Sequence, residues 1–176
     1  MPKRFSSTGG CIRFALDLAR KEKFNAALRA LRNVEGHHLS SDDLRLVAQV
    51  NNRCGVLDAA EGCWLEIERR GEIEPGDCYM LGSLQIQLMR DASAARCYER
   101  EIEIASSSGN DYFLTSSVIR LAELMLKLKN LVRAKEVLSR VDDSAGEYLH
   151  DVGFRTKADL LREIDLLENE NVPGSN

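Results

Sequence analysis

Five cysteines and three histidines are the residues of this 176-residue sequence that could carry nucleophilic chemistry. A catalytic cysteine needs a base that stabilises its thiolate, and the three imidazoles are His37, His38 and His150. None of these residues lies in a recognisable catalytic motif, and Cys63 and Cys97 each precede a large residue of an apolar segment. Buried packing is therefore the predicted role of the cysteines. A cysteine- or histidine-dependent enzyme stays open as an alternative.

Metal and phosphate sites are not indicated by residue spacing. A zinc site needs four ordered ligands, and no two cysteines form a C-x-x-C pair. Gly9 and Gly10, in the segment STGGC, lack the lysine and the preceding strand of a phosphate-binding loop, so we expect them in a flexible arm. Paired carboxylates such as Asp42 and Asp43 are expected to interact with helix ends. We therefore expect a protein that is not an enzyme and has no cofactor and no metal.

A polar face between residues 45 and 53 points to recognition of another chain. Arg45, Gln49, Asn52 and Arg53 recur at spacings of three and four, which places them on one side of a helix. Forked guanidinium donors and side-chain amides can bind a carboxylate or an extended backbone. A plain solvated helix face is the alternative interpretation.

Charge and composition limit the classes of partner. The formal net charge is −4, from 24 basic and 28 acidic residues mixed along the chain, which argues against nonspecific binding to nucleic acid or to an acidic membrane. No stretch approaches the roughly 20 apolar residues that span a bilayer, and the start lacks the apolar run of a secretory signal. The sequence therefore predicts a cytoplasmic protein without membrane insertion.

A repeat explains how the polar face would be positioned. Small residues recur in two columns and large residues in a third, spaced by 33, 34 and 40 positions in every column. The columns are Ala15, Ala48, Gly82 and Ala122; Ala27, Ala60, Ala94 and Ala134; and Leu31, Trp64, Tyr98 and Leu138. A unit of this length is too short to bury its own apolar face, so neighbouring copies are expected to stack.

Each copy shows the spacing of two helices. Apolar residues recur at intervals of three and four on either side of a break, which is the helical period. The breaks fall at residues 21–23, at Gly55, at Asp91 and at Asn130. Four antiparallel helical hairpins are therefore predicted.

The connections between copies carry their own signals. Gly71 is predicted to end a second helix, and Pro75 to lie in the first turn of the next helix. The segment SSSGN at residues 106–110 is predicted to be the loop that lengthens the last interval. After Ser144, a helical segment divided near Gly153 is expected to cover the last exposed apolar face.

These columns resemble the tetratricopeptide repeat (TPR), a motif of about 34 residues that forms two antiparallel helices. In the second copy, Gly55, Ala60 and Trp64 occupy the places of the family's glycine, alanine and phenylalanine. The sequence departs from the family's pattern as well. No copy has the proline that usually ends the second helix, and Asn51 and Gln85 replace a large apolar residue.

The resemblance covers roughly residues 8–142 and implies an all-α fold. About four stacked antiparallel helical hairpins would form a TPR-like superhelix with a C-terminal capping helix. The single helical domain is expected at residues 11–169, between a flexible arm at 1–10 and a flexible tail at 170–176.

The resemblance also implies that the first helices of the copies line a concave groove, whose outward polar residues meet a partner. These residues are Arg20, Arg45, Gln49, Asn52, Arg53, Tyr79, Ser83, Gln87, Glu123 and Lys127. Ile12 and Leu16 stand where some members hold the Lys and Asn of a carboxylate clamp, so that clamp is expected to be absent. This apolar pair is expected to form a hydrophobic end of the groove or to contact the N-terminal arm, and Ile119 is expected to add to the apolar part of the groove.

The sequence thus predicts a non-catalytic protein–protein interaction module. As an adaptor or scaffold, it would hold a segment of a protein or peptide partner in the concave groove of the helical stack. The alternative is a small TPR-like secretion chaperone, or an immunity protein that sequesters one effector or toxin. Nucleic acid is not an expected partner.

Overall fold

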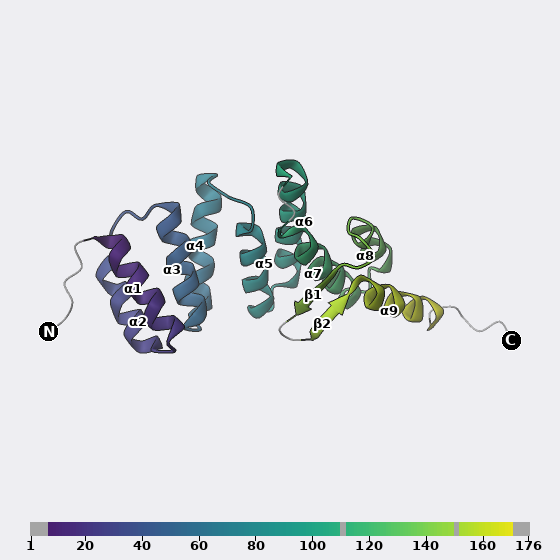
Figure 1. The fold of residues 1–176 in the computed structure, drawn as a ribbon, viewed down its shortest axis with the longest axis horizontal. Coiled ribbons are helices and arrows are strands. Elements are labelled where there is room, and N and C mark those ends of the chain that lie inside the picture. Colours follow the sequence, from purple (N-terminus) through teal and green to yellow (C-terminus); the bar gives the residue numbers. More distant parts are fainter. Residues whose placement is uncertain (1–6, 110–111, 150–151, 171–176) are drawn as a thin grey trace. The chain divides into compact units, whose positions relative to one another are not determined.

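The computed structural model describes residues 7–109, 112–149 and 152–170. Within these ranges the chain forms nine α-helices, one 3-10 turn and a two-stranded antiparallel sheet (Figure 1). The predicted all-α fold is confirmed, with a small β-hairpin added. The chain divides into two compact units, which are described separately: unit 1 comprises Met1–Glu74 and Leu84–Met89, and unit 2 comprises Pro75–Ser83 and Arg90–Asn176. No helix in the described ranges is both long and apolar enough to cross a membrane.

Unit 1 is built from two helical pairs. Its helices are α1 (Thr8–Arg20), α2 (Phe24–Leu31), α3 (Ser41–Arg53) and α4 (Leu57–Arg70), and α2 continues into the 3-10 turn η1 (Arg32–Val34). Short connections join α1 to α2 and α3 to α4, so the helices of each pair are antiparallel (Figure 1). The two pairs stack because α1 also packs against α3.

Side-chain caps fix where the first helix of each pair begins. The Ser7 hydroxyl accepts a hydrogen bond from the Gly10 backbone N–H at 3.2 Å, and the Ser40 hydroxyl accepts one from the Asp43 N–H at 3.1 Å. Helix α1 therefore begins at Thr8 and includes Gly9 and Gly10, so the expectation that these glycines belong to a flexible arm is wrong. Residues 1–6 of the expected arm and 171–176 of the expected tail lie outside the described residues.

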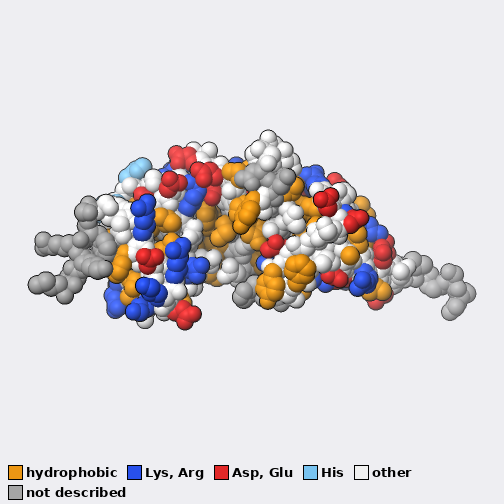
Figure 2. All heavy atoms as spheres, in the orientation of Figure 1, with side chains coloured by type: hydrophobic (Ala, Val, Ile, Leu, Met, Phe, Trp, Pro, Cys, Tyr) orange, Lys and Arg blue, Asp and Glu red, His pale blue; other side chains and the backbone are white. Residues whose placement is uncertain are grey.

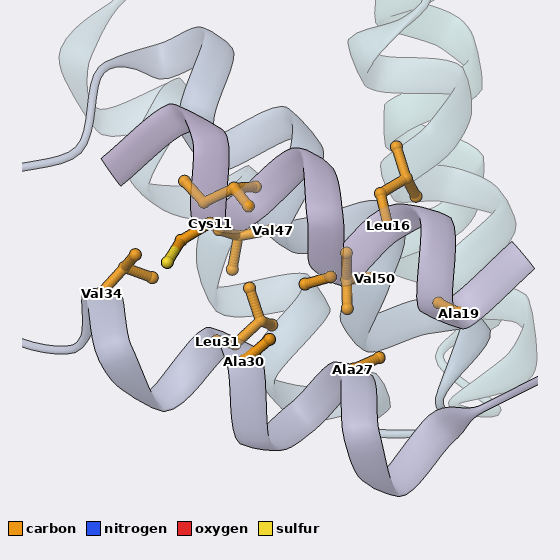
Figure 3. Packing of buried hydrophobic residues seen from close by; sticks show 11 residues of the cluster. Cys11, Leu16, Ala19, Ala27, Ala30, Leu31, Val34, Val47 and Val50 are labelled. Carbon is orange, nitrogen blue, oxygen red and sulfur yellow. The ribbon is translucent and has the colours of Figure 1, made fainter. Parts of the chain in front are cut away.

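The core of unit 1 forms where its helices meet. Buried side chains from α1, α2, η1 and α3 make one cluster, in which Ile12 and Ala27 are fully buried. Figure 3 shows Leu31 and Val34 directed toward Cys11 and Val47. Because the cluster includes Val47 and Val50 of α3, part of this burial comes from stacking of the two pairs and stabilises the stack.

Unit 2 contains further antiparallel helices, which are followed by a β-hairpin and a C-terminal helix. Its elements are α6 (Asp91–Ser108), α7 (Leu114–Lys127), α8 (Leu131–Leu138), β1 (Gly146–Leu149), β2 (Gly153–Thr156) and α9 (Lys157–Glu170). Helix α7 packs against α6, α8, β1 and α9. Helix α5 (Asp77–Gln87) is shared: residues up to Ser83 belong to unit 2 and the rest to unit 1.

The three sequence columns occupy equivalent places in the helices, and all twelve residues are buried. The first column lies on α1, α3, α5 and α7. The second column provides the fourth residue, and the third column the eighth residue, of each of α2, α4, α6 and α8. Gly82 shows why the first column is small, because a Cβ there would lie 3.0 Å from the Tyr98 ring. The predicted repeat is therefore confirmed in all four copies, including the register of the third.

The turn between the two helices of each copy has a repeated backbone conformation. A residue with positive φ precedes each second helix by two positions: Glu22 (φ 56°), Gly55 (φ 75°), Met89 (φ 59°) and Lys129 (φ 57°). Each of the four donates its backbone N–H to a carbonyl of the preceding helix. Only one of them is glycine, so the residue types do not reveal this column.

Three local predictions are corrected by the structure. The segment SSSGN is helical as far as Ser108, and the hydroxyls of Ser106, Ser107 and Ser108 donate to carbonyls within α6. Gly109 then ends the helix with φ 67°. Pro75 lies just before α5 and not in its first turn, since α5 begins at Asp77.

The third correction concerns the region after Ser144, which was predicted to be helical up to the tail. Residues 146–149 and 153–156 form an antiparallel pair, with Tyr148 opposite Phe154 and Glu147 opposite Arg155. Aromatic residues favour strands, and Gly153 adopts φ 95°, which helices do not allow. Only α9 remains helical here, and it packs against α7 and α8 as the predicted cap.

Candidate functional site

Arg45, which the sequence places at the centre of the polar face, is bound to its own chain. Its Nη1 atom lies 2.9 Å from Asp42 Oδ1 and 3.5 Å from Glu74 Oε1, and its Nη2 donates to the Glu72 backbone carbonyl at 2.7 Å. The Ser41 hydroxyl donates to the carboxylate of the same Glu72. Arg45 thus fastens the segment after α4 to the start of α3. A change at Arg45 would disturb this attachment as well as any partner.

The rest of the predicted polar face is less engaged. Gln49 and Asn52 are half-buried and Arg53 is exposed on α3. Among the described residues, these three side chains form no hydrogen bond or ion pair. On α1, Arg20 makes an exposed pair with Asp17 at 3.7 Å. The structure therefore brings Gln49, Asn52 and Arg53 together on one helix and leaves their role as a prediction.

The candidate residues on the shared helix α5 mostly serve packing. The Tyr79 ring centroid lies 5.8 Å from that of Tyr98 and 5.3 Å from that of Phe113, and the Ser83 hydroxyl is 3.2 Å from the Tyr98 hydroxyl. Burial raises the pKa of Tyr98 to about 12. Gln87 is exposed near the end of α5. Tyr79 and Ser83 thus belong to an aromatic cluster of unit 2.

The two candidates on α7 form ion pairs within unit 2. Glu123 accepts a hydrogen bond from Arg155 of β2 at 3.2 Å, and Lys127 lies 2.5 Å from Asp91 at the start of α6. Arg155 also donates to Glu163 of α9 at 2.5 Å. Glu123 therefore helps hold the β-hairpin to α7, and Lys127 joins α7 to α6.

The apolar residues expected in the groove are core residues instead. Ile12 and Ile119 are fully buried, and Leu16 is 5% exposed. These positions face the interior because their helices bury the stripe that also carries Ala15 and Ala122. The expectation that Ile12, Leu16 and Ile119 form an apolar part of the groove is therefore wrong.

Unit 1 contains a pocket that none of the predicted residues marks. Its volume is about 410 Å³, within the range of roughly 300–1,000 Å³ typical of ligand sites. Its apolar lining comes from α2, η1, α3, α4 and the segment between η1 and α3: Leu28, Leu31, Val34, Leu39, Val47, Val56 and Ala59. The pocket thus lies between the two helical pairs of unit 1.

Asn51 gives this apolar pocket a polar anchor. It lines the pocket from α3, and only 8% of the residue is exposed. Its side-chain amide has no hydrogen-bond partner among the described residues. By contrast Gln85, the other polar replacement in the repeat, is buried and donates to Glu61 at 3.4 Å. The Asn51 amide therefore offers a ligand one acceptor and two donors that no described residue uses.

The mouth of the pocket carries charged and polar groups. Arg32, Glu35 and His37 line it, and all three are exposed. Figure 2 shows basic side chains gathered over α1 and α2, the pair that supplies one wall. The departure of Asn51 from the apolar pattern is the sequence signal of the pocket, because its walls form only when the successive elements α2, η1, α3 and α4 pack together.

Unit 2 has a smaller hollow between α6, α7 and α8. Its volume is about 90 Å³, and Glu99, Arg133 and Arg140 are among its lining residues. Arg133 bridges Glu99 at 3.1 Å and Glu136 at 2.7 Å. This hollow is too small for more than a few waters, and its Arg133 is already paired with two carboxylates.

The surroundings of Cys54 and Cys63 disfavour the reactive thiolate form. Burial raises the pKa of the Cys63 thiol to about 11, and it also raises the pKa of Cys54. Cys11 and Cys78 are buried. The described residues contain no cluster of three or more His, Cys, Asp or Glu side chains that could hold a metal ion. His150 lies outside the described residues.

The β-hairpin of unit 2 exposes aromatic side chains. Tyr148 and Phe154 are cross-strand partners and are 67% and 64% exposed. The neighbouring pair, Glu147 and Arg155, points the other way and bonds to α7 through Ser116 and Glu123. Figure 2 shows apolar side chains over the hairpin. This face is an exposed apolar surface patch.

Comparisons with models of known protein families and with curated proteins find no match for this chain. The structure itself shows helices packed as sequential antiparallel pairs, with a C-terminal helix and a small hairpin.

Proposed function

We propose that this chain is a non-catalytic, TPR-like interaction module in which unit 1 holds an apolar segment of a partner protein. The observation that carries the proposal is the pocket of about 410 Å³, whose apolar walls surround the unpartnered amide of Asn51. The TPR likeness is supported by alanine at the fourth position of four second helices and by a large residue at the eighth.

The chemistry of the pocket suits a peptide segment. Apolar walls gain free energy by removing apolar side chains from water, at about 25 cal/mol per Å² of buried apolar surface. An asparagine amide offers one acceptor and two donors, which matches the N–H and C=O groups of a peptide backbone. Asn51 can therefore fix the register of a segment whose side chains fill the space above Leu31 and Val47.

The polar face of α3 would be a second contact surface, separate from the pocket. Gln49, Asn52 and Arg53 lie away from the pocket on the helical wheel, since Val47 and Asn51 occupy the opposite side of α3. They would extend the contact with a long partner. An adaptor and a chaperone that keeps a partner soluble would use the same pocket, so both biological settings remain within the proposal.

A photo-crosslinker at Ala59 tests this function. Ala59 lines the pocket yet is exposed, so benzoylphenylalanine at this position reaches the pocket without disturbing the core. Ala92, an exposed residue in the first turn of α6, is the matched control. We expect irradiation in cells of the source organism to join a protein to the Ala59 variant and not to the Ala92 variant. Equal amounts of crosslinked product from the two variants, or no crosslink between the Ala59 variant and another protein, would contradict the proposed function.

A further inference from the structure

The charge of unit 1 is divided between its two helical pairs. Residues 8–34, which form α1, α2 and η1, contain six basic and two acidic residues, whereas residues 35–74 contain four basic and nine acidic residues. All six basic residues of the first pair are exposed: Arg13, Arg20, Lys21, Lys23, Arg29 and Arg32. One wall of the pocket therefore belongs to a helical pair with a net positive charge.

One arginine of this helical pair lines the pocket, and a second lies beside it on α2. Arg32 lines the mouth, and Arg29 precedes it by three residues, so the two lie on the same side of the helix. Neither guanidinium forms an ion pair or a hydrogen bond with another described residue. Exposed forked guanidinium groups bind carboxylates through two parallel hydrogen bonds.

Two acidic residues of the second pair, Glu61 and Glu66, are engaged by other side chains. Glu66 is held by Arg69 and Arg70, and Glu61 accepts a hydrogen bond from the buried Gln85. Of the groups that line the pocket, only Glu35 carries a negative charge. Arg32 and Glu35 balance each other in the lining, so the preference for an anion comes from Arg29 and the other exposed basic residues of the first helical pair.

We infer that the partner segment is acidic as well as apolar, with carboxylates that pair with Arg29 and Arg32 while neighbouring apolar side chains enter the pocket beside Asn51. This inference rests on the proposed function and adds the chemical class of the partner. Nucleic acid would satisfy the arginines, but it has no aliphatic side chains for the walls formed by Leu31 and Val47. An acidic, apolar protein segment satisfies both parts of the site.

Fluorescence anisotropy with short labelled peptides tests the inference on the full chain. The probe is a peptide of alternating Leu and Glu, compared with peptides in which Gln or Lys replaces Glu and one in which Ser replaces Leu. We expect the Leu–Glu peptide to bind at least about tenfold more tightly than each of the others, and its affinity to fall with added salt.

Charge-matched variants locate the contact. Arg29→Gln with Arg32→Gln should weaken binding of the Leu–Glu peptide about tenfold or more. Arg13→Gln with Lys21→Gln removes the same charge from exposed positions of the same helical pair and should have a much smaller effect. Equal losses in the two double variants would overturn the assignment of the carboxylates to Arg29 and Arg32.

The other outcomes separate this inference from the proposed function. Equal binding of the Leu–Gln peptide would overturn the acidic preference and leave the proposed function standing, because the pocket would still hold an apolar segment. Failure of all peptides, or tighter binding of an oligouridine probe with the same dependence on Arg29 and Arg32, would also overturn the inference. Crosslinking at Ala59 tests the proposed function independently of peptide charge.

Discussion

Single polar residues in apolar surroundings are the most informative positions of this chain. Asn51 lines a pocket and has no side-chain hydrogen-bond partner among the described residues. Gln85 pairs with Glu61, and Glu101 is fully buried on α6. One carboxylate oxygen of Glu101 accepts the Gly76 N–H at 2.8 Å, and the other has no hydrogen-bond partner within the described residues. Glu101 thus helps to cap the start of α5, and its desolvation links folding to pH.

The first prediction concerns the proton on Glu101. Desolvation, and to a lesser extent the neighbouring Asp77 carboxylate, raise the pKa of Glu101 above its ordinary value of 4.5, so the folded chain holds this proton more tightly than the unfolded chain. Its contribution to stability is therefore complete below about pH 4.5 and is lost as the pH rises through the folded pKa. Relative to Glu101→Gln, the wild-type protein should gain unfolding free energy as the pH falls from about 7 to 4.5.

Urea unfolding at several pH values measures this difference. Glu103→Gln, an exposed change on the same helix, is the control and should give a curve parallel to that of the wild-type protein. A constant difference between the wild-type protein and Glu101→Gln across this range would show that the buried carboxylate does not take up a proton on folding.

The helical hairpin is the element that the sequence predicts best. The twelve column residues share burial and helix position, because the close approach of two helices permits only small or shape-matched side chains. The turns are less visible, since Glu22, Met89 and Lys129 adopt positive φ without the glycine that signals it. Their conformation is imposed by the packing of the helices on either side.

The C-terminal hairpin and the binding surface were the weak points of sequence reasoning. Strand pairing of Tyr148 with Phe154 depends on a turn and on anchoring by Arg155 to α7 and α9, which a local pattern does not encode. Helical periodicity predicts which residues share a face of one helix, but not which of them have partners on other elements. Arg45 and Lys127 turn out to have intrachain partners that come from other elements.

The second prediction tests the repeated turn. Lys129 is exposed and has φ 57°, a conformation that is unfavourable by about 1 kcal/mol for residues with a Cβ. Lys129→Gly should therefore raise the unfolding free energy by up to about 1 kcal/mol, less the greater chain entropy of glycine when unfolded. Thermal or urea unfolding measures the change. Lys129→Ala keeps the Cβ and should give no gain; a gain equal to that of glycine would mean that backbone strain is not the cause.

At the scale of the whole chain, the four helical hairpins share the same buried positions but expose different surface residues. Unit 1 combines a basic helical pair, an acidic helical pair and the pocket between them. Unit 2 pairs its charges across α6, α7, β2 and α9 and exposes the apolar face of its hairpin. A repeat fixes the backbone and leaves the outward residues free to vary, so the architecture alone does not specify a partner.

Nuclear magnetic resonance mapping of the Leu–Glu peptide on the labelled protein tests the central claim most directly, that the pocket of unit 1 is the binding site. The side-chain amide of Asn51 and the methyl groups of Leu31 and Val47 should show the largest shift changes. Changes confined to the α3 face formed by Gln49, Asn52 and Arg53, or to the hairpin around Phe154, would contradict the account.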